Sequence, residues 1–398
     1  MRVNFVLAAD RSIATARYHG WMVAAYLQRH GVATRMLATP PFPYRDAPWQ
    51  PALHRDVARL CAGEVVVLQK QRGENAEALA AALREAGART VAVYGDWDPD
   101  NDLAFRTDAL VCSARWLADH YAERGVDRVV AIPDPAEFWA DRDAIDGGPL
   151  EPGPIRLVWM GHRGNWETLE PLRELLRDAE LTDFRLVTVS NHADADVRWS
   201  PGAVRRVVAQ SHVGVVPTRP PPVSTAKSNN RVIQLMAAGK PFVAGRIPSY
   251  EEVVRQGWNG FLCDSPEEWR AALLELRSPE RRAETGRRGF DTVFPRYHAD
   301  TIGAEWLAFF DSLGAHGRND LPAAEEARLL ARVRGAAQMA YAREALARNL
   351  GLREVLRIAA PAAAYAPVVP GGADFLRDLA PILGSRAREK LVRTLRGG

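Results

Sequence analysis

The sequence has 398 residues, which is more than a single ordinary hydrophobic core holds and enough for two. Hydrophobic residues make up 47% of it and charged residues 25%, a composition that is typical of a globular protein and excludes a largely disordered chain. Lys and Arg number 52 against 49 Asp and Glu, and this near-balance argues against a nucleic-acid-binding protein, which needs a dense basic surface.

Short β-branched runs alternate with amphipathic stretches through the first part of the sequence, which indicates βαβ units and a parallel sheet. The expected strands are 3–7, 33–37, 65–68, 91–94, 109–112 and 129–132, with helices such as 17–30 and 74–86 between them. Proline and glycine then gather around residues 145–154, which is typical of a linker. We therefore expect an N-terminal Rossmann-like domain over residues 1–145 and a linker over 146–154.

The same alternation starts again after the linker. The expected strands are 156–160, 185–189, 213–216, 242–244 and 260–263, and the expected helices are 167–177, 201–210, 230–238, 249–256 and 266–276. This pattern predicts a second Rossmann-like domain over residues 155–317, so the fold class is α/β with two such domains. Ligands of parallel sheets bind at the carboxyl ends of the strands, and two facing domains form a cleft between those ends.

The last part of the sequence, residues 318–398, differs in composition and predicts a helical C-terminal extension. It is rich in Ala, Arg and Leu, is broken by prolines, and carries fourteen basic against eight acidic side chains. Its apolar stretch 358–370 is too short to span a bilayer. The basic end favours self-association, an acidic partner or a membrane surface, and a helix with a solvated face is the simpler alternative.

The cysteines and the start of the chain indicate the compartment. Cys61, Cys112 and Cys263 are widely spaced, so we expect neither a disulfide framework nor a cysteine-ligated metal. The chain enters an apolar strand directly after Met1, without a hydrophobic signal segment. We expect a cytoplasmic protein, with peripheral contact to the inner membrane face through the basic tail as an open possibility.

The most specific stretch is 224–245, STAKSNNRVIQLMAAGKPFVAG, in which a polar loop leads into an amphipathic helix. Free backbone N–H groups at Ser228, Asn229 and Asn230 would lie beside the cations Lys227 and Arg231. The amino end of a helix with adjacent cations is a favourable site for a phosphate or another anion. A capped helix with a solvated lysine is the alternative.

This stretch and its continuation, Ile247–Val254 (IPSYEEVV) and then Gly260–Leu262 (GFL), resemble nucleotide-sugar glycosyltransferases of the GT-B fold. The resemblance is to the large retaining family, of group 1 or family four type, and it covers roughly residues 1–315. The segments 108–113 (DALVCS) and 129–135 (VVAIPDP) resemble the end of that family's N-terminal domain. A glycosyltransferase of polysaccharide or natural-product biosynthesis is implied, with no cofactor besides its nucleotide-sugar co-substrate.

The resemblance also implies which residues bind the donor. Arg163, with His162 as second candidate, stands where the family presents an arginine to the pyrophosphate, and Lys227 with Ser228 and Asn229 would complete the phosphate site. Fixed cations stabilise the charge that grows on a leaving diphosphate. Gln234 stands where the family usually has a ribose-binding glutamate, and we assign Gln234, Asn230 and Arg231 to the ribose and sugar.

The N-terminal domain is expected to bind the acceptor. Arg17 and His19 follow the first strand, which places them near the cleft as candidate catalytic residues, although a surface arginine and a histidine at a helix start are the ordinary alternatives. The acidic run DWDPDND follows the strand 91–94, and its Asp96 and Asp98 are candidates for orienting or deprotonating an acceptor hydroxyl. A D-x-D pair that holds Mg²⁺ or Mn²⁺ and a pair of solvated loop acids are the alternatives; we favour the acceptor role, with no metal.

We therefore expect a hexosyl- or glycosyltransferase that moves a sugar from a nucleoside-diphosphate donor to an acceptor hydroxyl, with retention implied by the resemblance. The acceptor would be a glycan, a lipid-linked molecule or a small natural product. An epimerase of the same fold, acting on a nucleotide sugar, is one alternative. A degenerate scaffold that only binds the sugar nucleotide is the other, because Gln234 replaces the usual glutamate.

Overall fold

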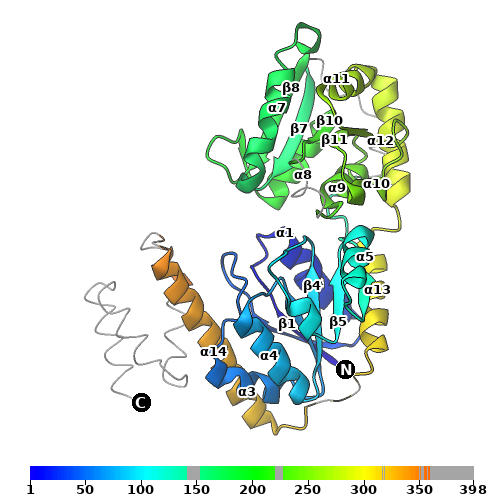
Figure 1. Cartoon of the computed structure of the whole chain (residues 1–398). Coiled ribbons are helices and arrows are strands. Elements are labelled where there is room, and N and C mark those ends of the chain that lie inside the picture. The colour runs from blue at the N-terminus through cyan, green and yellow to red at the C-terminus, as the bar shows by residue number, and fades with distance from the viewer. Residues whose placement is uncertain are drawn as a thin grey trace, which may run out of the picture.

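The computed structural model describes residues 1–140, 153–219, 227–315, 317, 319–348, 350, 354–355 and 357–358. Two separate parallel sheets form its framework, one in each half of Figure 1. Both predicted Rossmann-like domains are therefore present. Most of the predicted linker and the basic end of the tail lie outside the described residues.

The N-terminal sheet has six parallel strands in the order β2-β1-β3-β4-β5-β6. Along the chain the strands are β1 (Arg2–Val6), β2 (Ala33–Ala38), β3 (Val65–Gln69), β4 (Arg89–Tyr94), β5 (Ala109–Cys112) and β6 (Val129–Ala131). The helical segments between them are α1 (Ala14–Ala16), the π-helical η1 (Arg17–Met22), α2 (Val23–Arg29), α3 (Pro51–Leu60), α4 (Glu74–Glu85), η2 (Leu103–Arg106) and α5 (Arg115–Glu123). Every residue of β3 is buried, as expected for a central strand covered on both faces.

The second sheet also has six parallel strands, in the order β12-β11-β10-β7-β8-β9. These are β7 (Ile155–Gly161), β8 (Phe184–Ser190), β9 (Val197–Arg198), β10 (Val213–Val216), β11 (Phe242–Gly245) and β12 (Phe261–Cys263). Its helical segments are η3 (Arg163–Leu169), α7 (Glu170–Leu175), η4 (Ala179–Leu181), α8 (Pro201–Ala209), α9 (Asn230–Ala237), α10 (Pro248–Glu251), α11 (Pro266–Glu275) and α12 (Pro279–Val293). The short edge strand β9 was not predicted.

Local sequence explains where the helices of this domain begin and end. Ser200, Ser265 and Ser278 each accept a backbone N–H at the start of α8, α11 and α12, which satisfies a donor that the helix leaves free. Gly239, with a φ of 63°, lets the chain turn away after α9. The predicted helix over 230–238 is confirmed almost residue for residue.

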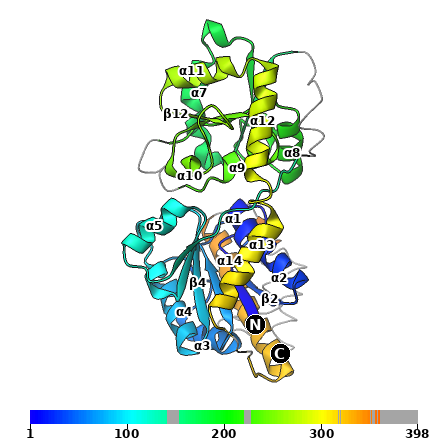
Figure 2. The ribbon, with the colours of Figure 1, turned by 90° about the vertical axis from the view of Figure 1, so that its right-hand side faces the viewer.

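After α12 the chain returns to the N-terminal sheet as α13 (Ala299–Ser312), which lies beside α2 in Figure 2. Trp306 and Phe310 of α13 are buried in one cluster with Val3, Phe5 and Leu27. From the sequence, all of residues 155–317 are expected to belong to the second domain, whereas α13 completes the core of the first. Its large apolar side chains explain this, because they cover one face of the N-terminal sheet.

The helix α14 (Ala323–Ala347) also packs on the N-terminal domain, against α3 and β2 (Figure 1). Leu329 and Val333 are buried among the side chains of α3 and α4, and the indole N–H of Trp49 donates to the carbonyl of Val333 at 2.7 Å. From the sequence, this helix is expected to belong to a separate extension. In the structure its apolar face is part of the first domain's core.

Candidate functional site

A lysine and an aspartate from different domains meet where the two sheets approach each other. Asp96 follows β4, and Lys227 precedes α9. The two residues form an isolated antiparallel bridge, and the Nζ of Lys227 lies 3.3 Å from Oδ1 of Asp96. The structure thus brings together two predicted site residues that are 131 positions apart in the chain.

A second lysine, which the sequence analysis did not select, binds the other oxygen of the same carboxylate. The Nζ of Lys70 lies 2.5 Å from Oδ2 of Asp96. Lys70 directly follows β3 and has a φ of 53°, a conformation that costs free energy in a residue with a side chain. Burial raises the pKa of Asp96, but the two ammonium groups outweigh it and hold that pKa well below its ordinary value. Asp96 is therefore a weak base.

The neighbouring Asp98 is also paired with cations. Its Oδ2 lies 3.3 Å from a guanidinium nitrogen of Arg45 and 3.4 Å from one of Arg72. Asp96 and Asp98 thus face lysines and arginines rather than each other. Across the described part of the chain, no group of three or more His, Cys, Asp or Glu side chains is arranged to hold a metal ion.

His19, a predicted catalytic residue, lies in η1 and pairs with an aspartate that the sequence analysis missed. Its Nε2 is 2.6 Å from Oδ1 of Asp134, in the segment after β6. Each of the two residues is 1% exposed. Their positions follow different strands, so only the topology of the sheet brings them together.

Arg17, the other candidate catalytic residue of η1, binds the segment after β6, where the chain leaves the N-terminal domain. Its Nε and Nη2 donate to the two carboxylate oxygens of Glu137 at 2.7 and 2.8 Å. The hydroxyl of Tyr18 donates to the same carboxylate at 2.8 Å. Burial and the charge of Glu137 raise the pKa of Tyr18 well above its ordinary value, so Tyr18 stays a neutral donor.

Gln234, the predicted ribose contact, forms hydrogen bonds with the same segment after β6. Its Oε1 accepts the backbone N–H groups of Glu137 at 2.7 Å and Phe138 at 3.3 Å, and its Nε2 donates to the carbonyl of Pro135 at 3.1 Å. Gln234 is 2% exposed. The side chain therefore ties α9 to the segment that connects the two domains.

The predicted phosphate-binding loop follows β7. Arg163 is exposed, and its backbone N–H donates to Oδ1 of Asn191 at 2.7 Å. The Nδ1 of His162 accepts the N–H of Gly164 at 3.1 Å, and burial together with the charge of Arg163 lowers the pKa of His162. A guanidinium N–H of Arg219, which follows β10, donates to the carbonyl of Gly164. This contact joins the ends of β7 and β10.

Unused hydrogen-bond donors surround the start of α9. The Nδ2 of Asn230 and Nη1 of Arg231 are buried and have no hydrogen-bond partner among the described residues. Ser228 and Asn229 come directly before the helix, next to Lys227. Buried donors are normally satisfied, so this cluster favours an anionic or hydroxyl-rich ligand.

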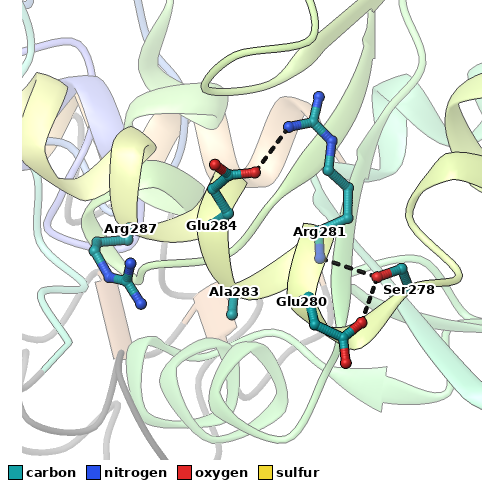
Figure 3. A pocket seen from close by; sticks show the side chains of 6 residues that line it. All are labelled: Ser278, Glu280, Arg281, Ala283, Glu284 and Arg287. Atoms are coloured by element: carbon teal, nitrogen blue, oxygen red, sulfur yellow. Dashed lines mark hydrogen bonds and ion pairs between the residues drawn. The ribbon is translucent and has the colours of Figure 1, made fainter.

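A pocket of about 570 Å³ opens elsewhere, beside the start of α12 (Figure 3). It is lined by Ser278, Glu280, Arg281, Ala283, Glu284 and Arg287. Its charged groups contact one another: Ser278 donates to Glu280 at 2.6 Å, and Arg281 lies 3.2 Å from Glu284. None of the predicted site residues lines this pocket, so we place the candidate site at the strand ends.

Residues 151–278, which include Arg163 and Lys227, match the family Glycosyl transferases group 1. Over these residues the chain is similar to group 1 glycosyltransferases. The expectation of a glycosyltransferase enzyme is confirmed. No curated protein matches the sequence. Among the described helices, none combines the length and apolar character that crossing a membrane requires.

Solved structures share the two-domain fold. HepE from Anabaena in complex with UDP-glucose is 13% identical, with a TM-score of 0.60 over 78% of this chain and 100% of HepE. Sucrose-phosphate synthase from Thermosynechococcus elongatus is 12% identical, with a TM-score of 0.59 over 79% of this chain and 99% of the synthase. A glycosyltransferase from Rickettsia africae is 14% identical, with a TM-score of 0.57 over 79% and 99%. These likenesses confirm the GT-B fold that the sequence predicted.

Proposed function

We propose that the protein transfers a sugar from a nucleoside-diphosphate donor to an acceptor hydroxyl, with retention at the anomeric carbon and without a metal ion. The observation that carries this proposal is the position of Lys227: it stands at the start of α9, inside the glycosyltransferase domain, and its ammonium group faces the N-terminal domain at Asp96. The UDP-glucose bound to HepE supports a nucleotide sugar as donor.

The donor's diphosphate would lie between the loop after β7 and the start of α9. Lys227 and Arg163 would neutralise it, with Ser228, Asn229 and His162 beside them. Asn230 and Arg231, whose buried donors have no partner in the described part of the chain, would bind sugar or ribose hydroxyls. Gln234 would reach the ribose only by giving up its contacts to Pro135 and Glu137, so donor binding and domain position would be coupled.

The acceptor would bind on the N-terminal side. Because the pKa of Asp96 is held well below its ordinary value, Asp96 would orient an acceptor hydroxyl rather than deprotonate it, with Asp98 next to it. In the reaction the acceptor oxygen bonds to the anomeric carbon while the bond from that carbon to the diphosphate breaks. The hydroxyl proton passes to the leaving phosphate oxygen on the same face. Lysine and arginine side chains stabilise the growing charge, which is work that a metal ion would otherwise do.

A cytoplasmic location is part of this proposal. So is a peripheral membrane contact or self-association through the basic tail, whose end lies outside the described residues. Acceptor screening would identify the acceptor class: a glycan, a lipid-linked molecule or a small natural product.

A thermal-shift screen with UDP-, GDP- and dTDP-sugars tests the donor, because a ligand that binds only the folded state raises Tm. The donor that raises Tm is then incubated with candidate acceptors, and the configuration of the product is read by NMR. No Tm shift with any nucleotide sugar, or conversion of the donor without an acceptor, would contradict the proposal. Detectable transfer would remove the alternative of a scaffold that only binds the donor.

A further inference from the structure

His19 is a candidate catalytic residue from the sequence, but its pairing with Asp134 has no role in the proposed function above. His19 lies in η1, a π-helical segment between α1 and α2. Such wide turns are rare and occur frequently at functional sites. Asp134 follows β6 and contacts His19, which follows β1. The two residues therefore meet at the carboxyl ends of the strands, where ligands of parallel sheets bind.

Each member of the pair keeps one polar atom unused. The Nδ1 of His19 and Oδ2 of Asp134 are buried, and neither has a hydrogen-bond partner among the described residues. An ionised carboxylate only accepts hydrogen bonds, so the proton of a neutral imidazole that contacts it lies on Nε2. Nδ1 is then left with a lone pair that can accept a hydrogen bond from a hydroxyl.

Gly95 leaves free space beside the imidazole ring. A Cβ at this position would lie 3.6 Å from Cε1 of His19, 3.5 Å from Oγ of Ser113 and 3.5 Å from Cγ2 of Thr15. The φ of Gly95 is not positive, so the backbone itself does not require glycine here. The missing side chain therefore creates a small space lined by the imidazole and a hydroxyl group.

This space adjoins the contact between the domains. Gly95 is followed directly by Asp96, whose carboxylate is paired with Lys227. A donor diphosphate that binds Lys227 would release Oδ1 of Asp96, one residue from Gly95. The imidazole would then face an acceptor that lies on Asp96.

We propose that the space at Gly95 receives a hydroxyl group of the acceptor, and that Nδ1 of His19 accepts a hydrogen bond from it. Asp134 is a positioning residue, because its carboxylate hydrogen-bonds only the imidazole among the described residues and fixes the proton on Nε2. The inference rests on the proposed function and adds to it the residues that orient the acceptor. The proton of the reacting hydroxyl still passes to the leaving phosphate.

Three variants separate this role from a structural one. His19→Gln places an amide nitrogen near the position of Nε2, so it keeps a donor for Asp134 and removes Nδ1. Asp134→Asn can donate to Nε2 and so move the imidazole proton to Nδ1. Gly95→Ala adds a methyl group at ordinary contact distances, so it should fold normally while filling the space.

We expect His19→Gln and Asp134→Asn to lower kcat about a hundredfold, with unchanged donor affinity and nearly unchanged Tm. Gly95→Ala should raise the KM of the acceptor and leave that of the donor unchanged. His30→Gln, on the C-terminal end of α2, is the matched control and should behave as wild type. If the His19 variant fails to fold, the Asp134 and Gly95 variants still decide the question.

Transfer at the wild-type rate by Asp134→Asn, together with an unchanged acceptor KM in Gly95→Ala, would overturn the inference. A lower Tm without a lower kcat of the folded enzyme would also overturn it, because that is the signature of a structural pair. Failure of the wild-type protein to transfer sugar, although donor binds, would instead contradict the proposed function itself.

Discussion

The ammonium group of Lys227 lies 3.3 Å from the carboxylate of Asp96, so the lysine expected to bind the donor's phosphates is already paired across the two domains. Lys70 holds the second oxygen of that carboxylate at 2.5 Å. A diphosphate carries more negative charge than one carboxylate and accepts more hydrogen bonds, so it would compete effectively for Lys227. Donor binding and the contact between the domains are thus linked through one side chain.

Replacing Asp96 by Asn should strengthen donor binding while weakening transfer. The change releases Lys227 from an ion pair that is partly exposed, which predicts a donor Kd lower by about two- to fivefold. It also removes a group proposed to orient the acceptor, so kcat should fall. Titration calorimetry with the identified donor measures the first effect. Asp98→Asn is the control, since Asp98 pairs with Arg45 and Arg72 instead; weaker donor binding by Asp96→Asn would contradict the competition.

The same ion pairs predict how pH acts on stability. The pKa of Asp96 in the folded protein is held below the ordinary value of 3.8, so its pairing stabilises the fold fully above that value. The contribution is lost only as the pH falls from there through the lower, folded pKa. The difference in Tm between wild type and Asp96→Asn should therefore be constant over about pH 5 to 8 and shrink below about pH 4. A difference that changes near neutral pH would show that another group titrates with Asp96.

Removing the cations that we propose bind the donor's diphosphate should affect catalysis more than folding. Lys227→Ala and Arg163→Ala should each lower kcat by about a hundred- to a thousandfold, because diphosphate charge grows as the glycosidic bond breaks. The guanidinium of Arg163 is exposed, so its loss should leave Tm unchanged. His162→Ala should be milder in rate, although it removes the acceptor for the N–H of Gly164. Near-normal transfer by Lys227→Ala at saturating donor would move the assignment to Arg231.

Local patterns in the sequence were sufficient to predict every strand of the two sheets except β9, the helix α9, and the candidates Lys227 and Asp96. Each of these depends on residues that are neighbours in the chain. Lys70, Asp134 and Glu137 were missed because their importance comes from partners that the fold brings from other strands. Lys70 carried one usable signal: it is one of only four lysines and directly follows a buried strand.

Other differences between the sequence predictions and the structure arise where contacts between distant segments determine the role of a residue or helix. Gln234 was assigned to the ribose from a motif, but its amide matches the backbone groups of the connecting segment, which no motif encodes. The sequence of α14 is mostly Ala, Arg and Glu, so its amphipathic character is weak. Small side chains such as Ala336 and Ala342 let α14 lie close to α3. The sequence of α14 alone does not predict this contact, because it depends on the position of α3.

Chelating divalent metals should not change the rate of transfer. Asp96 and Asp98, the acids that could hold a metal, are already neutralised by Lys70 and Lys227 and by Arg45 and Arg72. A metal ion would have to displace these cations, which costs more than binding to free carboxylates. Transfer is measured with and without EDTA, at saturating donor and acceptor. Loss of activity that Mn²⁺ restores would return the D-x-D pair to the role of a metal site.

Truncation within the C-terminal region should show that α14 belongs to the folded core. If residues 318–398 formed a separate extension, as expected from the sequence, a chain ending at about Asp320 would keep donor binding. The buried face of α14 leads us to expect the opposite. Such a chain loses Leu329 and Val333 from the core and leaves the indole N–H of Trp49 without its acceptor. Uncovered apolar surface and an unsatisfied buried donor both destabilise a fold.

A chain ending at residue 360 is the matched control, because it keeps every described core residue, including Val355 and Ile358. We expect it to melt cooperatively, with a Tm close to that of the full chain and normal donor binding in the thermal-shift assay. The chain ending at residue 320 should aggregate or melt well below the control. If both chains fold and bind donor equally well, α14 rests on the N-terminal domain without stabilising it, and the core of that domain is complete with α13.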